Sequence, residues 1–234
     1  LPYADQDVVP RDALTQKVAR AKALLSGAAG AIELNDLLMD QVRAFLAATP
    51  EDGFSLSESL DAAAVADRVD RYDRASLRLS VVLACVAQWG SAAHRPALQK
   101  AFARMTDRIE MVSGQNRNLA MRWLPVINAF YACGIAAVDA GRFDNLAAIF
   151  STTVAHVRAG NTRRSSLVDA VGDAIPEIEG GQVLRVLPAY QHSTLPLSDY
   201  MFQNWQGRLD DALFLGKNFG PAFDVFEQIF FLVV

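Results

Sequence analysis

The polar stretch "VRAGNTRRSS", residues 157–166, holds the side chains best suited to binding chemistry. Arg158, Arg163 and Arg164 gather just before a predicted helix that Ser165 can cap. The first N–H groups of a helix lack partners and attract anions, and arginine adds paired donors for phosphate or carboxylate. The pattern predicts a ligand-binding site for a small anionic ligand, a nucleotide or an acidic surface. The alternative is a solvated surface loop.

Two further groups combine polar and aromatic residues. Arg117, Asn118, Arg122 and Trp123 stand together at the start of an apolar run, where Trp123 is expected to pack in the core. The segment "YQHSTLPLSDYMFQNW", residues 190–205, joins aromatics to a proline loop. It either lines a groove or forms a connector that its own aromatics hold in place.

The residue types most often used in catalysis do not form a recognisable set. Phosphate-binding glycine loops, zinc-protease motifs and nucleophile elbows are absent from the sequence. His94, His156 and His192 lack metal-ligand spacing, and His156 is expected near a helix C-terminus. Cys85 and Cys133 lie in apolar runs, where burial keeps a thiol protonated. We therefore predict no catalytic residue, no metal and no cofactor, and a chain that is not an enzyme.

Composition narrows the class of protein. The 234 residues are 52% hydrophobic and 21% charged, with a net charge of −4, as in ordinary globular domains. Neither half of the chain is basic, which argues against nucleic acid and anionic lipid as partners. Two cysteines and a polar start without a leader favour a reducing compartment. The prediction is a bacterial, cytoplasmic protein.

The elements that position these residues show helical periodicity almost throughout. No run alternates in the manner of a strand, so no sheet is expected. Asp67 with Arg71 and Asp70 with Arg74 form i,i+4 pairs on an exposed helix face. The predicted helices span residues 10–26, 32–48, 64–89, 93–108, 118–140, 143–152, 165–173, 181–190, 198–215 and 221–234.

The run "WLPVINAFYACGIAAVDAGRFDNLAAIF", residues 123–150, begins with sixteen uncharged residues. A spanning helix needs about 20 apolar residues, and Pro125 and Asn128 interrupt this one. We therefore predict a buried central helix and no membrane span. Gly134 lets a neighbouring helix approach closely, and Gly141 ends the helix.

Part of this run is similar to a tetratricopeptide helix–turn–helix unit, with "AGRFD" as the turn. A second pair, "VVLACVAQWGSAAHRPALQKAFARM", follows the same plan. Two units are too few for a regular repeat. The expected fold is all-α: a single helical domain over residues 1–234, built as an irregular helical bundle or a short α-solenoid with tetratricopeptide-like helix pairs.

Four pieces in order carry a wider resemblance: "ELNDLLMDQVRAFL", "VDRYDRASLRLSVVLACVAQWG", "YACGIAAVDAGRFDNLAAIF" and "FDVFEQIF". Over residues 31–230 the chain resembles an uncharacterised C-terminal helical region of large multi-domain bacterial proteins. These carry sirtuin-like, TIR-like or P-loop NTPase effector domains and look like antiphage or conflict proteins. The chain departs from their "YPALLLLYA" run at Leu124–Tyr131, where Asn128 is inserted. The resemblance implies a sensing, scaffolding or oligomerisation module beside an effector domain of the same parent chain.

The ends of the sequence lead to one more expectation. The chain begins at Leu1 and ends inside the apolar run "FEQIFFLVV". An uncapped apolar helix end calls for a partner surface, so we expect a piece of a longer protein. The predicted function is a non-catalytic protein-interaction, oligomerisation or sensing module. The alternatives are a helical domain that binds an anionic ligand or nucleotide, and an enzyme with an unfamiliar active site.

Overall fold

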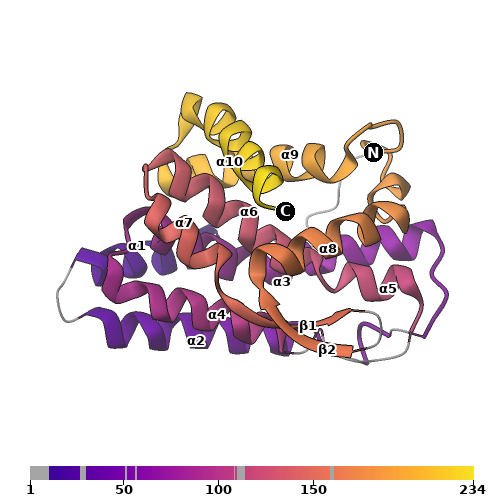
Figure 1. Ribbon diagram of the computed structural model, residues 1–234, viewed down its shortest axis with the longest axis horizontal. Helices are drawn as coiled ribbons and strands as arrows, with labels where there is room; N and C mark the ends of the chain where they lie inside the picture. The colour runs from indigo at the N-terminus through magenta and orange to yellow at the C-terminus, as the bar shows by residue number, and fades with distance from the viewer. Residues whose placement is uncertain are drawn as a thin grey trace.

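The protein is mostly helical, with one small β-hairpin (Figure 1). The computed structural model describes residues 11–26, 30–50, 52–55, 57–107, 109, 114–158 and 161–234. Its helices are α1 Arg11–Ser26, α2 Gly30–Ala48, α3 Ala62–Trp89, α4 Arg95–Thr106, α5 Asn116–Met121, α6 Leu124–Asp139, α7 Phe143–Phe150, α8 Leu167–Gly180, α9 Pro196–Leu213 and α10 Phe219–Val233. Short 3-10 turns within these residues lie at Ala92–His94, Leu184–Val186 and Gly216–Asn218. The all-α prediction is confirmed at this level.

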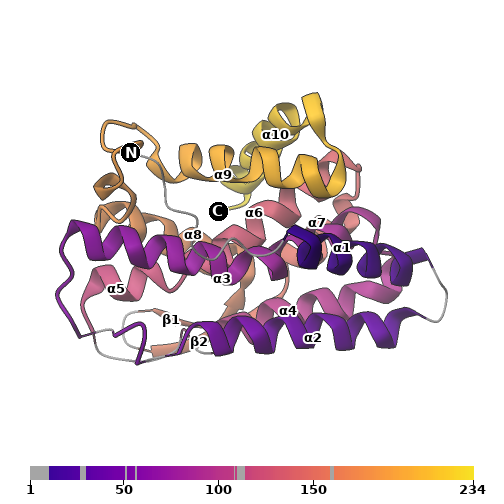
Figure 2. The same ribbon diagram turned by 180° about the vertical axis from the view of Figure 1, so that it is seen from behind.

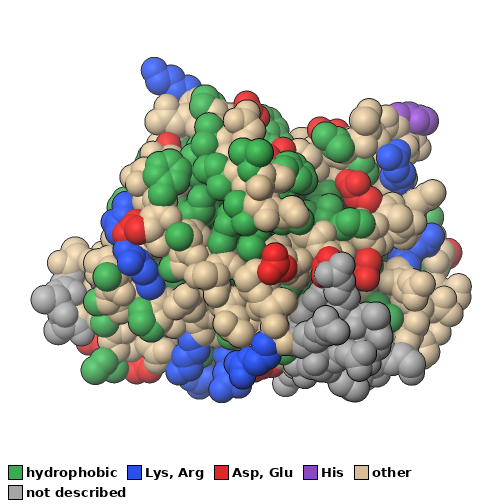
Figure 3. All heavy atoms as spheres, in the orientation of Figure 1, with side chains coloured by type: hydrophobic (Ala, Val, Ile, Leu, Met, Phe, Trp, Pro, Cys, Tyr) green, Lys and Arg blue, Asp and Glu red, His purple; other side chains and the backbone are tan. Residues whose placement is uncertain are grey.

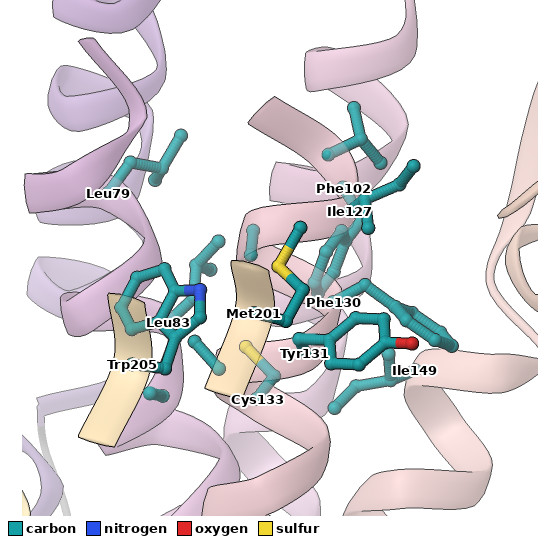
Figure 4. Packing of buried hydrophobic residues seen from close by; sticks show 14 of the residues in the cluster. Leu79, Leu83, Phe102, Ile127, Phe130, Tyr131, Cys133, Ile149, Met201 and Trp205 are labelled. Carbon is teal, nitrogen blue, oxygen red and sulfur yellow. The ribbon is translucent and has the colours of Figure 1, made fainter. Parts of the chain in front are cut away.

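The helices stack in layers around α3 and α6. The pairing of these two helices is the most extensive in the described part of the chain. Helices α2 and α4 run along one side of the pair, and α9 and α10 cover the other (Figures 1 and 2). One hydrophobic cluster contains side chains from every helix between α1 and α10. Figure 4 shows Leu79 and Leu83 of α3, Phe130 of α6, and Met201 and Trp205 of α9 within it.

Helix α6 is the buried central helix that its uncharged sequence predicts. Every residue from Leu124 to Ala137 is buried. The helical stretch Asn116–Asp139 is long and apolar enough to cross a membrane, but 89% of its apolar window is covered by the rest of the protein. The predicted single helix over residues 118–140 is in fact α5 followed by α6. Pro125 lies in the first turn of α6, where its fixed φ and missing N–H favour a helix start.

Two glycines of the central run have the roles that the sequence predicts: one ends the helix and the other allows a close helix contact. The helix in that close contact is not the expected one. Gly141 has φ +63° just after α6, and the Arg142 N–H donates to the Ala137 carbonyl at 2.7 Å. A Cβ on Gly134 would overlap the ring of Phe226. The helix that approaches Gly134 is therefore α10, whereas a tetratricopeptide-like pair would place α7 there. The structure does not confirm tetratricopeptide-like pairing.

A β-hairpin corrects the expectation that the chain has no strands. Strands β1 Thr153–Arg158 and β2 Asn161–Ser166 pair antiparallel in the region predicted as a loop. Val154 of β1 is 1% exposed, and β1 packs against α4, so tertiary burial stabilises a strand too short to be recognised by its pattern. His156 consequently lies in β1 and not near a helix C-terminus.

Other boundaries also move. The helix predicted at residues 165–173 begins at Leu167 and continues to Gly180. The helix predicted at 181–190 is reduced to the turn Leu184–Val186. The i,i+4 pairs on α3 are present, with N–O distances of 3.8 Å for Asp67–Arg71 and 2.6 Å for Asp70–Arg74.

Candidate functional site

The predicted arginine site lies on the β-hairpin. The strand register places Arg158 opposite Asn161, Arg163 opposite His156, and Arg164 opposite Ala155. The side chain of Arg164 is exposed. Those of Arg158 and Arg163 lie outside the described part of the structure. The anion role of Arg158, Arg163, Arg164 and Ser165 stays a prediction.

The serine that caps α8 is not the predicted one. Ser166 is the N-cap: its hydroxyl accepts from the Asp169 N–H at 3.2 Å and donates to the Asp169 carboxylate at 2.5 Å. Ser165 lies in β2, and its buried hydroxyl has no hydrogen-bond partner among the described residues. The N-terminus of α8 was expected to attract an external anion. It already interacts with a carboxylate of the same helix, that of Asp169.

Within the predicted polar and aromatic group at the start of the apolar run, Arg117 and Asn118 form a clamp that holds separate chain segments together. Arg117 Nε donates to the Gly181 carbonyl at 3.0 Å, and Asn118 Nδ2 donates to the Glu58 carbonyl at 2.7 Å. Trp123 is buried, as expected of a packing residue. A cavity of about 740 Å³ beside this clamp is lined largely by polar side chains and backbone, including Glu58 and Gln182. Its lining can offer hydrogen bonds to a polar molecule.

The aromatic segment 190–205 is held in place mainly by contacts among its own residues. The rings of Tyr190 and Tyr200 meet edge to face with centroids 5.7 Å apart, and Trp205 is completely buried. His192 is exposed in a turn. Tyr200 also lines a cavity of about 500 Å³ between α3 and α9. The connector interpretation describes most of this segment, and the cavity is a groove-like feature beside it.

A buried polar network that the sequence did not reveal lies beside this cavity. The Asp73 carboxylate of α3 accepts from both Nη atoms of Arg208 of α9, at 2.8 and 2.5 Å. It also accepts from Asn128 Nδ2 of α6 at 3.4 Å, and Asn128 Oδ1 accepts from Trp205 Nε1 at 3.2 Å. The network joins three helices through four side-chain hydrogen bonds. The one sequence signal for it was Asn128 inside an apolar run.

Burial keeps several titratable groups of the core in their neutral form. Burial and the nearby Asp73 carboxylate raise the pKa of Tyr200 well above its ordinary value, so its hydroxyl remains neutral. Burial raises the pKa of Cys85 to about 12, and that of Cys133 well above its ordinary value. Both thiols are buried and protonated, as predicted. Among the described residues, no group of three or more His, Cys, Asp or Glu is arranged to hold a metal ion.

Helix α10 has a buried face and an exposed face. On the buried face, Phe219, Phe223, Phe226 and Phe230 are at most 3% exposed. Glu227 accepts hydrogen bonds from Tyr131 Oη and Ser198 Oγ, both at 3.0 Å. These contacts fix the helix firmly against α6 and α9.

The outer face and the last turn of α10 present large apolar side chains to solvent, and we call this area the α10 surface. Its members and their exposed fractions are Val225 39%, Phe231 60%, Leu232 86%, Val233 53% and Val234 60%. Figure 3 shows hydrophobic side chains gathered over α10. The apolar run "FEQIFFLVV" had indicated such a surface.

Comparison of the chain with models of protein families, with curated proteins and with solved structures finds no match.

Proposed function

We propose that this chain is a non-catalytic protein-interaction module whose docking site is the α10 surface. The observation that carries the proposal is the exposure of Phe231, Leu232, Val233 and Val234 next to one another at one end of a helix. Contiguous exposed apolar patches are uncommon on monomers and mark interaction sites, whereas isolated exposed apolar residues need no explanation.

The energetics favour docking at this surface. Complete burial of a Val, Leu or Phe side chain contributes about 1.5–3 kcal/mol, so a few such side chains supply a useful share of a binding free energy. The helix is held in advance by its phenylalanine face and by Glu227, so binding requires little ordering of its backbone. An amphipathic helix laid beside α10 is the matching partner geometry.

The wider resemblance suggests one candidate for the natural partner. Proteins with a similar helical region carry an effector domain in the same chain, and such a domain can lie against α10. The module would then scaffold or regulate that domain without performing chemistry itself.

A direct test uses a synthetic amphipathic helix of about 18 residues, long enough to form a helix, with a leucine stripe and glutamine flanks. Its fluorescence anisotropy is measured on titration with the wild-type chain and with the Phe231→Ser/Leu232→Ser variant. Ile32→Ser is the matched control, because Ile32 is 75% exposed on α2, away from α10. Binding lost in the double variant and kept in the control supports the proposal. No binding to wild type, or equal binding to all three, overturns it.

A further inference from the structure

The charged side chains of helices α8 and α10 all have one sign, and Lys217 lies in the turn before α10, at the end opposite to the exposed apolar residues. Helix α8 carries Asp169, Asp173, Glu177 and Glu179, and its sequence contains no lysine or arginine. Helix α10 carries Asp224 and Glu227 and also lacks basic residues. Asp224 is exposed at the outer side of α10. The two helices therefore contribute six carboxylates and no cation of their own.

The acidic helix α8 meets the α10 surface. A Cβ on Gly172 of α8 would overlap the side chain of Val234, so the end of α10 packs directly on α8. Figures 1 and 2 show the C-terminus beside α8 from both sides. Figure 3 shows acidic side chains along the edge of the hydrophobic area where α8 passes. The apolar docking surface thus has a negatively charged border on the side where α8 passes.

We infer that the partner of the α10 surface is an amphipathic protein helix with lysine or arginine beside its apolar stripe; this inference rests on the function proposed above. Complementary charge at the rim of an interface accelerates association and suppresses wrong partners. A second copy of this chain would bring the same acidic border and a net charge of −4. An anionic membrane would face the same repulsion.

The test compares three synthetic helices with the same leucine stripe and flanks of lysine, glutamine or glutamate. A few exposed ion pairs together change affinity by about tenfold. At low ionic strength we therefore expect the lysine helix to bind about tenfold more tightly than the glutamine helix, and the glutamate helix more weakly than both. The difference between lysine and glutamine should shrink at about 1 M salt, where the Debye length falls to about 3 Å.

Charge variants locate the effect on the protein. Asp173→Asn/Asp224→Asn removes two carboxylates at the α10 border, and Asp36→Asn/Asp40→Asn removes two exposed carboxylates of α2. Both variants change the net charge equally. The first should lose most of the preference for lysine while still binding the glutamine helix, and the second should behave as wild type.

The outcomes separate this inference from the proposed function. If the glutamine helix binds at the α10 surface but lysine brings no gain, the docking surface stands and the basic-partner inference fails. If both charge variants reduce the lysine preference equally, the effect comes from net charge and the inference also fails. Self-association of the free chain through Leu232, measured by analytical ultracentrifugation of wild type and Leu232→Ser, would name a second copy as the occupant and overturn the inference. Binding of the chain to anionic lipid vesicles that Leu232→Ser abolishes would name a membrane and overturn it as well.

Discussion

Helices α6 and α10 have similar apolar sequences and opposite environments. In α6, every residue from Leu124 to Ala137 is buried, and its neighbours cover all of its sides. In α10, four phenylalanines are buried on one face while Phe231 and Leu232 face solvent. Apolar composition therefore does not by itself determine burial. The position of the helix in the bundle decides it, and the uncovered face of α10 is where we propose that a partner completes the packing.

The largest expected effect concerns the buried face of α10. Phe226→Ala removes a ring that contacts the rings of Phe130, Tyr131 and Phe150 and fills the space over Gly134. Truncating a core phenylalanine costs about 3–5 kcal/mol. Urea denaturation should show this loss of unfolding free energy. A cost below about 1 kcal/mol would mean that α10 does not pack on α6 as described.

The polar network that joins the core to α9 should be nearly as sensitive. Asp73→Ala leaves Arg208, whose side chain is 27% exposed, without its partner. We expect a loss of about 3 kcal/mol, at the lower end for broken buried pairs. Asp70→Ala is the matched control on the same helix: it breaks the Arg74 pair, whose side chains are 41% and 48% exposed, and should cost less than about 1 kcal/mol. Equal costs for the two variants would contradict a special role for the network.

The close approach of α6 and α10 can be tested at its narrowest point. Gly134→Ala adds a Cβ that overlaps the Phe226 ring. Overpacking of this kind costs about 1–3 kcal/mol, partly offset by the higher helix propensity of alanine. Thermal unfolding should record a lower Tm, and combining Gly134→Ala with Phe226→Leu should recover part of it. A Tm unchanged or raised by Gly134→Ala would show that the two helices are not in tight contact.

Glu227 makes the stability of the contact between α10 and its neighbours α6 and α9 depend on pH. Burial raises the pKa of its carboxyl above the ordinary value, and the hydrogen bonds from Ser198 and Tyr131 offset part of that rise. The folded state therefore binds the proton more tightly than the unfolded state, in which the carboxyl has a pKa of about 4.3. The contribution of this group to stability is greatest below that pH and is lost as the pH rises through the folded-state pKa.

Glu227→Gln keeps the size and shape of the side chain and removes the titration; one of the two acceptor oxygens becomes an NH2 donor, to which the Ser198 or Tyr131 hydroxyl can turn as acceptor. The stability of the variant relative to wild type should rise as the pH increases from about 4 through the folded-state pKa. The check is urea denaturation at several pH values, with the surface variant Glu177→Gln as the control for loss of one carboxylate. Parallel stability curves for wild type and Glu227→Gln would refute the assigned environment.

The smallest change in stability is expected on the exposed face of α10. Phe231→Ser/Leu232→Ser alters side chains that contact solvent, so the unfolding free energy should stay within about 0.5 kcal/mol of wild type for each substitution. Far-UV circular dichroism and urea denaturation provide the measurement. A loss comparable to that of Phe226→Ala would mean that these residues hold the fold together and are not a free docking surface.

Local periodicity in the sequence was enough to predict most of the helices, including α6 and its end at Gly141. It failed for the β-hairpin, because β2 is polar and β1 is stabilised by the burial of Val154 and by packing against α4. It also failed for the polar network, because Asp73 and Arg208 are separated by 135 residues in the chain. Pairings of that range depend on how the helices stack, which local patterns do not encode.

The candidate sites likewise divide into features that have a local sequence signal and features that have none. The apolar end of α10 could be predicted, because a run of consecutive large apolar residues exceeds what one buried helix face can cover. The arginine stretch was predicted with the wrong local structure, and Ser166 caps α8 in place of Ser165. The cavity beside Asp73 and Tyr200 had no local signal, since its walls come from α3 and α9.

The proposed function depends on the docking of a partner on the exposed face of α10. Methyl NMR of the leucine and valine side chains during titration with the lysine-flanked helix tests it most directly. We expect the resonances of Val225, Leu232, Val233 and Val234 to shift together, while those of the core residues Leu79 and Leu83 remain in place. Shifts centred on another face of the molecule, or no shifts at saturating peptide, would contradict it.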